Sequence, residues 1–406
     1  MSEDYVRRTM KAPAELTATA GRTMDGEVVE MLMEACAQLD ASDLHLTVGE
    51  PPIFRLHGRL YRVEGYKDLD GEDTLGATLA LLGEDEPTNR YWQRFHESGG
   101  ADIAAALEER GARFRVSVFQ QKGHPAIALR LIPDEILTFE QLGLPVESVK
   151  EMLHKPRGII LLTGPTGCGK TTTIATMIDY INRNRDTHII TIEDPIEYFH
   201  EGKRSILNQR EVGVDVSSFA ESVTRNMRSD PDVMLVGEMR DLETMRACLQ
   251  AAETGHLVLS TLHTVSAPKT VDRLVTAFPT AEQEEIRAMT STSLMAVFSE
   301  ELIPLKDGRG RIAAYEIMVG EPGGSAAIGN LIRERKTSQM RSTIQSSRHL
   351  GMQLLESHLA RLVKGGEIEF EEAYNRANQK TDLLEFLDDY AIPEEYRQAA
   401  ELADGG

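Results

Sequence analysis

A glycine-rich run in the middle of the chain has the residue types and spacing that bind phosphate. It matches the pattern G-x-x-x-x-G-K-[ST] and reads Gly164, Pro165, Thr166, Gly167, Cys168, Gly169, Lys170, Thr171. Glycines allow backbone N–H groups to turn inward around phosphate oxygens. Lys170 adds a positive charge, and the Thr171 hydroxyl is a ligand for Mg²⁺. The run, with Thr172 after it, therefore predicts a nucleotide site.

The residues on both sides of this run favour the same interpretation. Residues 158–163 are apolar and partly β-branched, which predicts a short buried strand. Residues 172–181 carry apolar side chains at helical spacing. A glycine-rich loop between a strand and a helix presents phosphates to the helix N-terminus, where the helix dipole favours negative charge.

Hydrolysis of a nucleotide also requires a metal ligand and a group that positions the attacking water. Glu193 and Glu197 follow an apolar run at 188–192, and Glu238 follows another at 233–236. Because the carboxyl ends of parallel strands meet at one edge of a sheet, we expect these carboxylates near the phosphate loop. A single acidic strand end is also typical of a helix cap or a solvated turn, but several in α/β order favour catalysis.

Two histidines, His256 and His263, bracket the apolar run 257–261. A histidine in this position is typical of a packed or surface residue as well as of a nucleotide sensor. Spacing alone leaves both interpretations open.

The elements that must position these residues fall into two structured parts. Residues 1–25 lack periodicity, which predicts a flexible arm. Residues 26–133 combine a helix with alternating runs, which predict an antiparallel sheet with flanking helices. The alternating runs lie at 43–46, 53–56, 112–119 and 126–131.

A helical linker is expected over residues 134–156. In residues 157–320 apolar runs alternate with helical segments, which predicts a largely parallel α/β sheet. Residues 321–406 are mostly helical and end in an acidic tail. The predicted fold class is α/β, with a second domain in front of the nucleotide domain.

Composition bounds the function. The 406 residues are 41% hydrophobic and carry a formal net charge of −21. No apolar run approaches the roughly 20 residues that span a bilayer, and the first residues are acidic, so we expect a cytoplasmic protein. The negative charge argues against nucleic acid as a partner. Three scattered cysteines fit a reducing compartment and give no metal site.

In their order, these motifs resemble the type IV pilus retraction ATPases, the PilT family of the secretion ATPase superfamily, over about residues 40–375. The matching segments are Ser42 to His45, the Walker A loop Gly164 to Thr171, the Asp box Thr191 to Glu197, the Walker B segment Val236 to Thr244, the His box Ala252 to Thr264, and the helical motif Ala327 to Glu334 tied to retraction.

The resemblance implies a homo-hexameric ring. Each subunit would have a PAS-like α+β N-terminal domain and a RecA-like P-loop ATPase domain with a helical C-terminal part, and ATP and Mg²⁺ would bind between them. Glu197 would position the attacking water, with Glu193 as the second choice. Glu238 would act on Mg²⁺, partly through water, while Lys170 and Thr171 would contact the phosphates and metal.

The resemblance also assigns roles outside these motifs. His256 and His263 would sense the nucleotide state, and Arg113 and Arg115 would reach the nucleotide from the N-terminal domain. Strand alternation places the two arginines on one face. Two solvated strand arginines are the alternative.

The implied partners are other copies of the chain, an inner-membrane platform protein of the pilus and a second pilus ATPase, at the cytoplasmic base of the pilus and without insertion into the membrane. Pilus extension and type II secretion ATPases share the core motifs, but many carry a tetracysteine zinc site, which three cysteines cannot form. A non-hydrolysing structural partner is disfavoured because Lys170, Glu197 and Glu238 are intact. A RecA-type nucleic-acid motor is disfavoured by the charge.

Two positions depart from the family pattern. Cys168 replaces a small residue in the phosphate loop and adds an oxidisable thiol. Gly329 stands where the retraction motif has arginine, after an unusual segment at 321–326.

Overall fold

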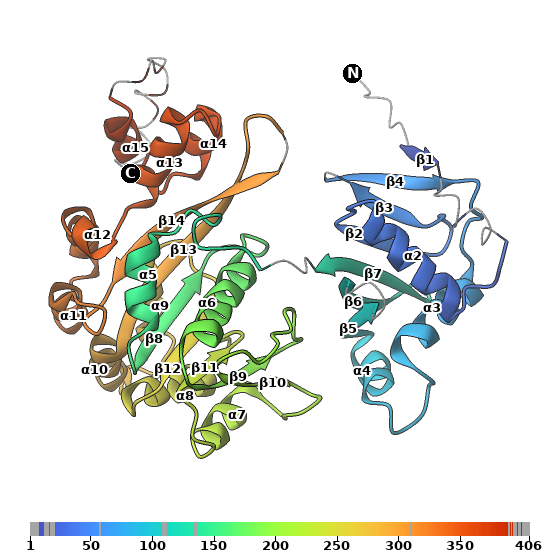
Figure 1. Cartoon of the computed structure of the whole chain (residues 1–406), viewed down its shortest axis with the longest axis horizontal. Coiled ribbons are helices and arrows are strands. Elements are labelled where there is room, and N and C mark those ends of the chain that lie inside the picture. The colour runs from blue at the N-terminus through green and yellow to red at the C-terminus, as the bar shows by residue number, and fades with distance from the viewer. Residues whose placement is uncertain are drawn as a thin grey trace. The chain divides into compact units, whose positions relative to one another are not determined.

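The computed structural model describes residues 8–11, 16, 21–56, 58–107, 112–132, 136–308, 310–388, 390, 392, 396 and 399. The chain forms two compact units, Met1–Glu135 and Ile136–Gly406 (Figure 1). We call them the N-terminal unit and the ATPase unit, and describe each by itself. The predicted α/β class is confirmed.

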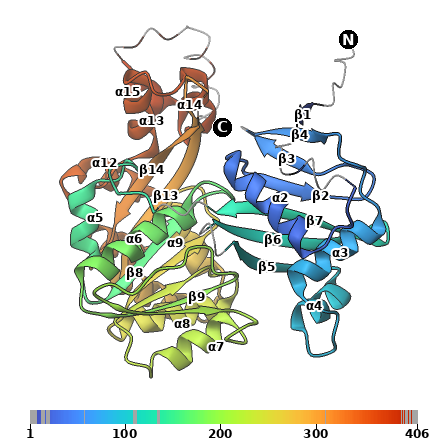
Figure 2. The same cartoon turned by 45° about the vertical axis from the view of Figure 1, so that its right-hand side comes forward.

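The N-terminal unit is built on one seven-stranded sheet with the strand order β1-β4-β3-β2-β7-β6-β5. Helix α2 lies over the face of this sheet in Figure 2. The elements are β1 (Thr9–Lys11), α2 (Gly26–Gln38), β2 (Asp43–Leu46), β3 (Ile53–Leu56), β4 (Arg59–Glu64), α3 (Gly71–Leu82), α4 (Arg90–Ser98), β5 (Gly100–Leu107), β6 (Ala112–Gln121) and β7 (His124–Ile132).

Alternation along β6 explains how this sheet acquires its core. Phe114, Val116 and Val118 are completely buried, while the residues between them are only half-buried. Because successive side chains point to opposite faces, one face of β6 packs against the apolar side of α2. The predicted antiparallel arrangement holds for β2 to β7.

The prediction of a flexible arm over residues 1–25 is wrong for Thr9–Lys11, which form strand β1. This strand pairs in parallel with β4, with Thr9 opposite Arg62. Three residues are too few to show a periodic pattern, and the backbone of an open sheet edge offers hydrogen bonds to any extended segment. Much of the remaining arm lies outside the described residues.

The ATPase unit has a second seven-stranded sheet, of order β10-β9-β11-β12-β8-β13-β14. All neighbouring strands run parallel except β13 and β14, which are antiparallel. The strands are β8 (Gly158–Thr163), β9 (His188–Glu193), β10 (Ile206–Glu211), β11 (Val233–Val236), β12 (Leu257–Leu262), β13 (Leu294–Pro304) and β14 (Arg311–Val319).

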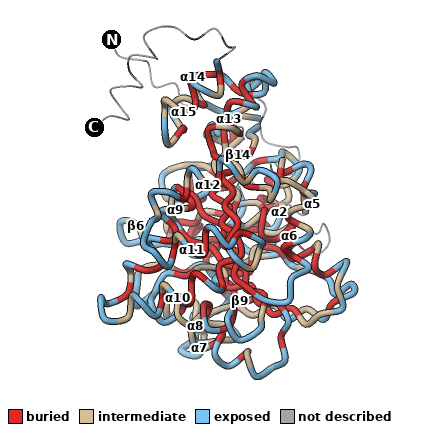
Figure 3. Tube along the Cα trace, turned by 90° about the vertical axis from the view of Figure 1, so that its left-hand side faces the viewer, coloured by how far each residue is buried: buried red, intermediate tan, exposed pale blue. Residues whose placement is uncertain are grey.

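Helices cover this sheet, with α5 and α6 in front of it in Figure 1. Every residue of β8, β11 and β12 is buried, which requires cover on both faces. The red trace of Figure 3 follows this buried interior. The helices are α5 (Val146–Leu153), α6 (Lys170–Asn184), α7 (Phe219–Asn226), α8 (Leu242–Glu253), α9 (Ala267–Thr276), α10 (Gln283–Ser293), α11 (Ala326–Arg333), α12 (Met340–Ser346), α13 (Leu355–Lys364), α14 (Phe370–Arg376) and α15 (Lys380–Phe386).

The segment predicted as a linker is part of the ATPase unit from residue 136 onwards. Helix α5 buries Val149, Met152 and Leu153 in the same apolar cluster as the central strands. A helix that buries one face in a core cannot act as a free linker, so the division of the chain falls just before it, at Glu135.

Candidate nucleotide-binding and hydrolysis site

The glycine-rich loop joins β8 to α6 and is pressed against strand β13. Gly164 has φ +141° and Gly169 has φ +108°, a region that side chains rarely adopt. A Cβ added at Gly164 would lie 2.3 Å from the backbone oxygen of Glu300, and one added at Gly169 would lie 2.3 Å from Glu300 Oε1. The first and last glycines of the motif are therefore required by close packing as well as by backbone angle.

Lys170 is held over this loop. Its Nζ donates hydrogen bonds to the carbonyl oxygens of Gly164, at 2.9 Å, and Pro165, at 2.8 Å. Helix α6 begins at Lys170 with no side-chain cap on its first N–H groups. Uncapped N–H groups and a lysine charge at one point are the features that favour an anion at a helix N-terminus.

The next two residues connect the loop to the Asp box. Thr171 is half-buried. The hydroxyl of Thr172 lies 3.1 Å from that of Tyr198, which directly follows Glu197. This contact fixes the Asp-box turn against the start of α6. Sequence analysis missed Tyr198, although its place beside the acidic run was a signal.

The two Asp-box glutamates differ in burial. Glu193 is the last residue of β9, is 8% exposed, and accepts a hydrogen bond from Gln209 Nε2 at 3.4 Å. Burial raises the pKa of Glu193 to about 7, although the backbone N–H of Glu197 also donates to it. Glu197 is half-buried, on the turn that follows. The geometry thus makes Glu193 the inner carboxylate and Glu197 the outer one.

The Walker B carboxylate is held from both sides. Glu238 follows β11, and its Oε1 lies 3.1 Å from His263 Nε2 while its Oε2 lies 2.8 Å from Arg240 Nε. Its neighbour Met239 donates a backbone hydrogen bond to Thr261 of β12 at 3.1 Å. The parallel pairing of β11 with β12 therefore brings Glu238 and His263 together at the carboxyl edge of the sheet.

The structure separates the two histidines that the sequence analysis grouped. His256 precedes β12 at the amino end of the strand, and its Nδ1 lies 2.9 Å from the carbonyl oxygen of Ala251. Six strand residues separate the two histidines, and seven steps of about 3.3 Å put His256 about 23 Å from His263. Within this chain His263 is at the site, and His256 is at the opposite edge of the sheet.

Arg113 and Arg115 belong to the N-terminal unit. Both are half-buried on the same face of β6, as alternation predicts. In the sheet Arg115 is directly opposite Arg130 of β7, which is paired with Asp43 at 2.9 Å.

The donor set fits Mg²⁺, which prefers hard oxygen ligands and keeps several of its waters. The Thr171 hydroxyl and the Glu238 carboxylate supply such oxygens. Among the described residues no group of three or more His, Cys, Asp or Glu could hold a metal ion. An ion here would therefore depend on few protein ligands together with phosphate and water, as nucleotide sites do.

Cys168 is a packing residue of the loop. It is 3% exposed, and its Sγ would lie 2.7 Å from a Cβ at Gly164. Burial raises the pKa of this thiol to about 11. The reactive form of cysteine is the thiolate, so the structure makes Cys168 far less oxidisable than its sequence position indicated.

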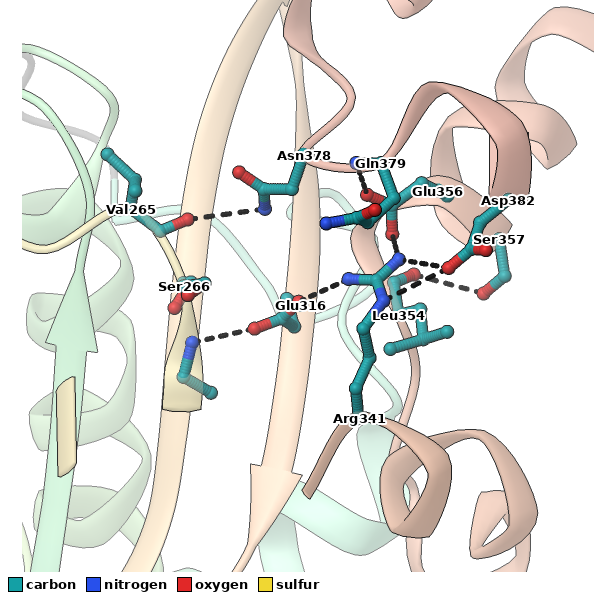
Figure 4. A network of polar contacts seen from close by, with 12 residues as sticks. Val265, Ser266, Glu316, Arg341, Leu354, Glu356, Ser357, Asn378, Gln379 and Asp382 are labelled. Atoms are coloured by element: carbon teal, nitrogen blue, oxygen red, sulfur yellow. Dashed lines mark hydrogen bonds and ion pairs between the residues drawn. The ribbon is translucent and has the colours of Figure 1, made fainter. Parts of the chain in front are cut away.

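A half-buried arginine links the segment after the His box to the C-terminal helices (Figure 4). Arg341 of α12 lies 2.7 Å from Glu356 and 2.5 Å from Asp382. It also lies 3.9 Å from Glu316 of β14, whose Oε1 accepts a hydrogen bond from the backbone N–H of Ala267 at 2.6 Å. Ala267 begins α9, four residues after His263.

Close packing explains why a glycine occupies position 329 of the retraction motif. A Cβ at Gly329 would lie 2.4 Å from Glu321 Oε2 and 3.2 Å from the backbone oxygen of Ser291. Glu321, in the unusual segment before the motif, pairs with Arg333 at 2.9 Å. Glycine thus leaves room for the Glu321 side chain, which bonds to an arginine of the same helix.

A RecA-like sheet that carries a glycine-rich phosphate loop and several carboxylates at its carboxyl edge is the arrangement of a P-loop ATPase. The family of type II/IV secretion system proteins matches residues 26–382. The chain is 45% identical to the type IV pilus retraction ATPase PilT of Pseudomonas aeruginosa, over 86% of this chain and 98% of that protein. The chain belongs to the family of type II/IV secretion system proteins.

Two further comparisons agree. A twitching motility protein of Neisseria gonorrhoeae is 42% identical over 82% of this chain and 86% of its own length. A crystal structure of the pilus retraction motor PilT with bound ADP is similar at a TM-score of 0.78 and 44% identity, covering 88% of this chain and 99% of that one. The predicted resemblance is confirmed.

Proposed function

We propose that this chain is the ATPase that powers retraction of a type IV pilus, working as a homo-hexamer. The observation that carries the proposal is the near-complete match to a retraction ATPase, 98% of whose length is covered. The complete set of Lys170, Glu197 and Glu238 in one unit agrees with hydrolysis and argues against a purely structural role.

In the proposed reaction Lys170 leaves the carbonyl oxygens of its own loop and contacts the nucleotide phosphates. Mg²⁺ held by Thr171, and through water by Glu238, would neutralise charge that develops on the phosphates. Glu197 orients the attacking water and accepts its proton. Glu193 positions the Glu197 turn by accepting its backbone hydrogen bond.

His263 has a positioning role in this scheme. Because it holds Glu238 Oε1 at 3.1 Å, a change in the bound phosphate that moves Glu238 also moves His263 and the start of α9. From there the path leads through Ala267 and Glu316 to Arg341 and the C-terminal helices. This path is how hydrolysis would reach helices α12, α13 and α15.

No helix among the described residues has the length and apolar character to span a bilayer. We place the ring at the cytoplasmic base of the pilus, against an inner-membrane platform protein, with a second pilus ATPase as a further partner. Arg113 and Arg115 would complete the nucleotide site of a neighbouring subunit.

The test is steady-state ATP hydrolysis by the purified full-length chain beside Glu197→Gln and Glu238→Gln, with oligomer size measured on the same samples. Wild type is expected to hydrolyse ATP as a hexamer, and each substitution is expected to lower turnover by at least about a hundredfold. Glu201→Gln, at an exposed position after the same turn, is the matched control and should retain activity.

Direction is tested in cells of the source organism. Deletion of the gene is expected to leave surface pili in place and abolish twitching, and wild type but not Glu197→Gln should restore movement. Loss of surface pili on deletion would instead assign the chain to extension.

A further inference from the structure

A buried acidic side chain lies directly beneath the phosphate loop. Ser299 of β13 is paired with Thr163, the last residue of β8, so the next residue, Glu300, falls under the first glycine of the loop. Its side chain is 2% exposed and touches the last glycine, Gly169, as described above. One residue thus contacts both ends of the loop.

Two hydroxyl groups meet this carboxyl group. Thr173 Oγ1 lies 3.0 Å from Glu300 Oε2, and Tyr315 donates to Glu300 Oε1 at 3.4 Å. The two hydroxyl oxygens lie 3.3 Å from each other. Three groups that are mutually within hydrogen-bond distance form a closed triangle under the loop.

The number of protons decides how many of these contacts are hydrogen bonds. An ionised Glu300 only accepts hydrogen bonds, so both hydroxyls donate their single hydrogen to it. No hydrogen then remains for a bond between the two hydroxyl oxygens. A protonated Glu300 donates to Thr173, which donates to Tyr315, which donates back to Glu300. Only the protonated form closes a ring of three hydrogen bonds, and buried polar groups favour complete satisfaction.

The charge of Lys170 connects this triangle to the nucleotide. Lys170 is one residue after Gly169 and interacts electrostatically with Glu300. An ionised Glu300 would attract Lys170 towards the floor of the loop and lower the positive potential that phosphate meets. The protonated form leaves the whole lysine charge available to the ligand.

We propose that Glu300 is a positioning residue of the phosphate loop, which in its protonated form supports the loop for nucleotide binding and in its ionised form weakens binding by neutralising Lys170. The inference rests on the nucleotide site described above and does not depend on the direction in which the pilus moves.

The pH range of this effect follows from burial. Desolvation raises the pKa of Glu300 to about 8, so the protonated form dominates below that value. Bound phosphates are negative and raise this pKa further. By linkage, the affinity for nucleotide then falls as pH rises through about 8. The total fall is up to tenfold for each unit by which bound nucleotide raises the pKa of Glu300.

Other titratable groups face the triangle. Burial raises the pKa of Cys168 to about 11 and that of Tyr315 well above its usual value, and it lowers the pKa of His358, which accepts a hydrogen bond from the backbone of Tyr315, to about 4. These three stay neutral between pH 7 and pH 9. Glu301 is half-buried on the same strand and lies outside the triangle.

The test measures the affinity of the full-length chain for fluorescent ADP with Mg²⁺ from pH 7 to pH 9, in wild type and Glu300→Gln. An amide donates to Thr173 and accepts from Tyr315, so glutamine keeps the ring and cannot ionise. Wild type is expected to bind about three- to fivefold more weakly at pH 9 than at pH 7. Glu300→Gln should match wild type at pH 7 and lose much less affinity than wild type between pH 8 and pH 9, which lies above the pKa of about 7 at which Glu193 also ionises.

Glu301→Gln is the control and should retain the wild-type fall, and thermal unfolding of each variant establishes that it folds. Parallel curves for wild type and Glu300→Gln, or a Glu300→Gln that binds more weakly at pH 7, would overturn the role of Glu300. Absence of ADP binding at every pH in a folded wild type would overturn the nucleotide site itself.

Discussion

The acidic residues around the phosphate loop differ in how deeply they are buried. Glu193 and Glu300 are almost completely buried, and desolvation raises the pKa values of both carboxyl groups. Glu197 and Glu238 keep partial exposure, as their proposed roles beside the attacking water and a hydrated metal ion would require. The sequence does not distinguish these four glutamates, whereas burial separates the two supporting groups from the two that we propose to react.

The same reasoning applies to the thiols. All three cysteines are buried, and burial raises each pKa, to about 12 for Cys36 and about 11 for Cys168. We expect the native chain at pH 8 to show almost no fast reaction with a thiol reagent such as Ellman's reagent, and the unfolded chain to show three thiols. A rapidly modified Cys168, identified by mass spectrometry, would contradict its assignment as a packing residue.

At the scale of elements, strand order assembles the site. Because β9, β11, β12 and β8 are neighbours and parallel, their carboxyl ends deliver the Asp box, Walker B, His263 of the His box and the phosphate loop to one edge. The arginine cluster of Figure 4 then ties this edge to α12, α13 and α15. Glu356 in that cluster also accepts a hydrogen bond from the backbone N–H of Gln379, at 2.8 Å.

Arg341→Met tests the cluster. The change leaves Glu316 and Glu356, which are at most 1% exposed, without their cation, so we expect the free energy of unfolding to fall by about 3–5 kcal/mol. Urea unfolding of the full chain is the measurement. Arg335→Met is the matched control, because Arg335 pairs with Glu284 at an exposed site and should cost at most about 1 kcal/mol. Equal losses in the two variants would show that the buried pairs contribute nothing special.

At the scale of the whole molecule, the chain consists of two units, and the candidate site groups are divided between them. Lys170, Glu197 and Glu238 lie in the ATPase unit, whereas Arg113 and Arg115 lie on one face of β6 in the N-terminal unit. In the proposed ring, these two arginines at i and i+2 of one strand would contact the phosphates bound to a neighbouring subunit.

The double change Arg113→Ala with Arg115→Ala should lower ATP turnover at least about tenfold while leaving ADP affinity nearly unchanged, because the arginines would stabilise charge that develops during transfer. Arg59→Ala, at an exposed position of β4, is the control. Mixing the double variant with Glu197→Gln should restore part of the activity, since some mixed interfaces regain both functions. No recovery in mixed hexamers would contradict action between subunits.

Local patterns were sufficient for much of this protein. The phosphate loop depends on neighbours in sequence, and the strands β2, β3 and β11 have the bounds that the apolar runs predict. The α/β order of the ATPase unit also followed from the alternation of runs, because period and turn residues are local properties. The sequence analysis predicted no strand at β1, β5, β10 or β13; β1 is too short to show a pattern, and the edge strand β10 carries no strong apolar pattern.

The tertiary structure alone decided which distant residues meet. Glu300 and Tyr315 follow the loop by more than a hundred residues. Glu300 reaches the loop because β13 pairs with β8, and Tyr315 reaches it because β14 pairs with β13, a register that no local pattern encodes. Likewise the sequence does not distinguish His256 from His263. They lie at opposite ends of β12, and only the end with His263 lies at the edge of the sheet that carries the phosphate loop. The sequence by itself determined the chemistry that is available, and the strand order determined which groups share a site.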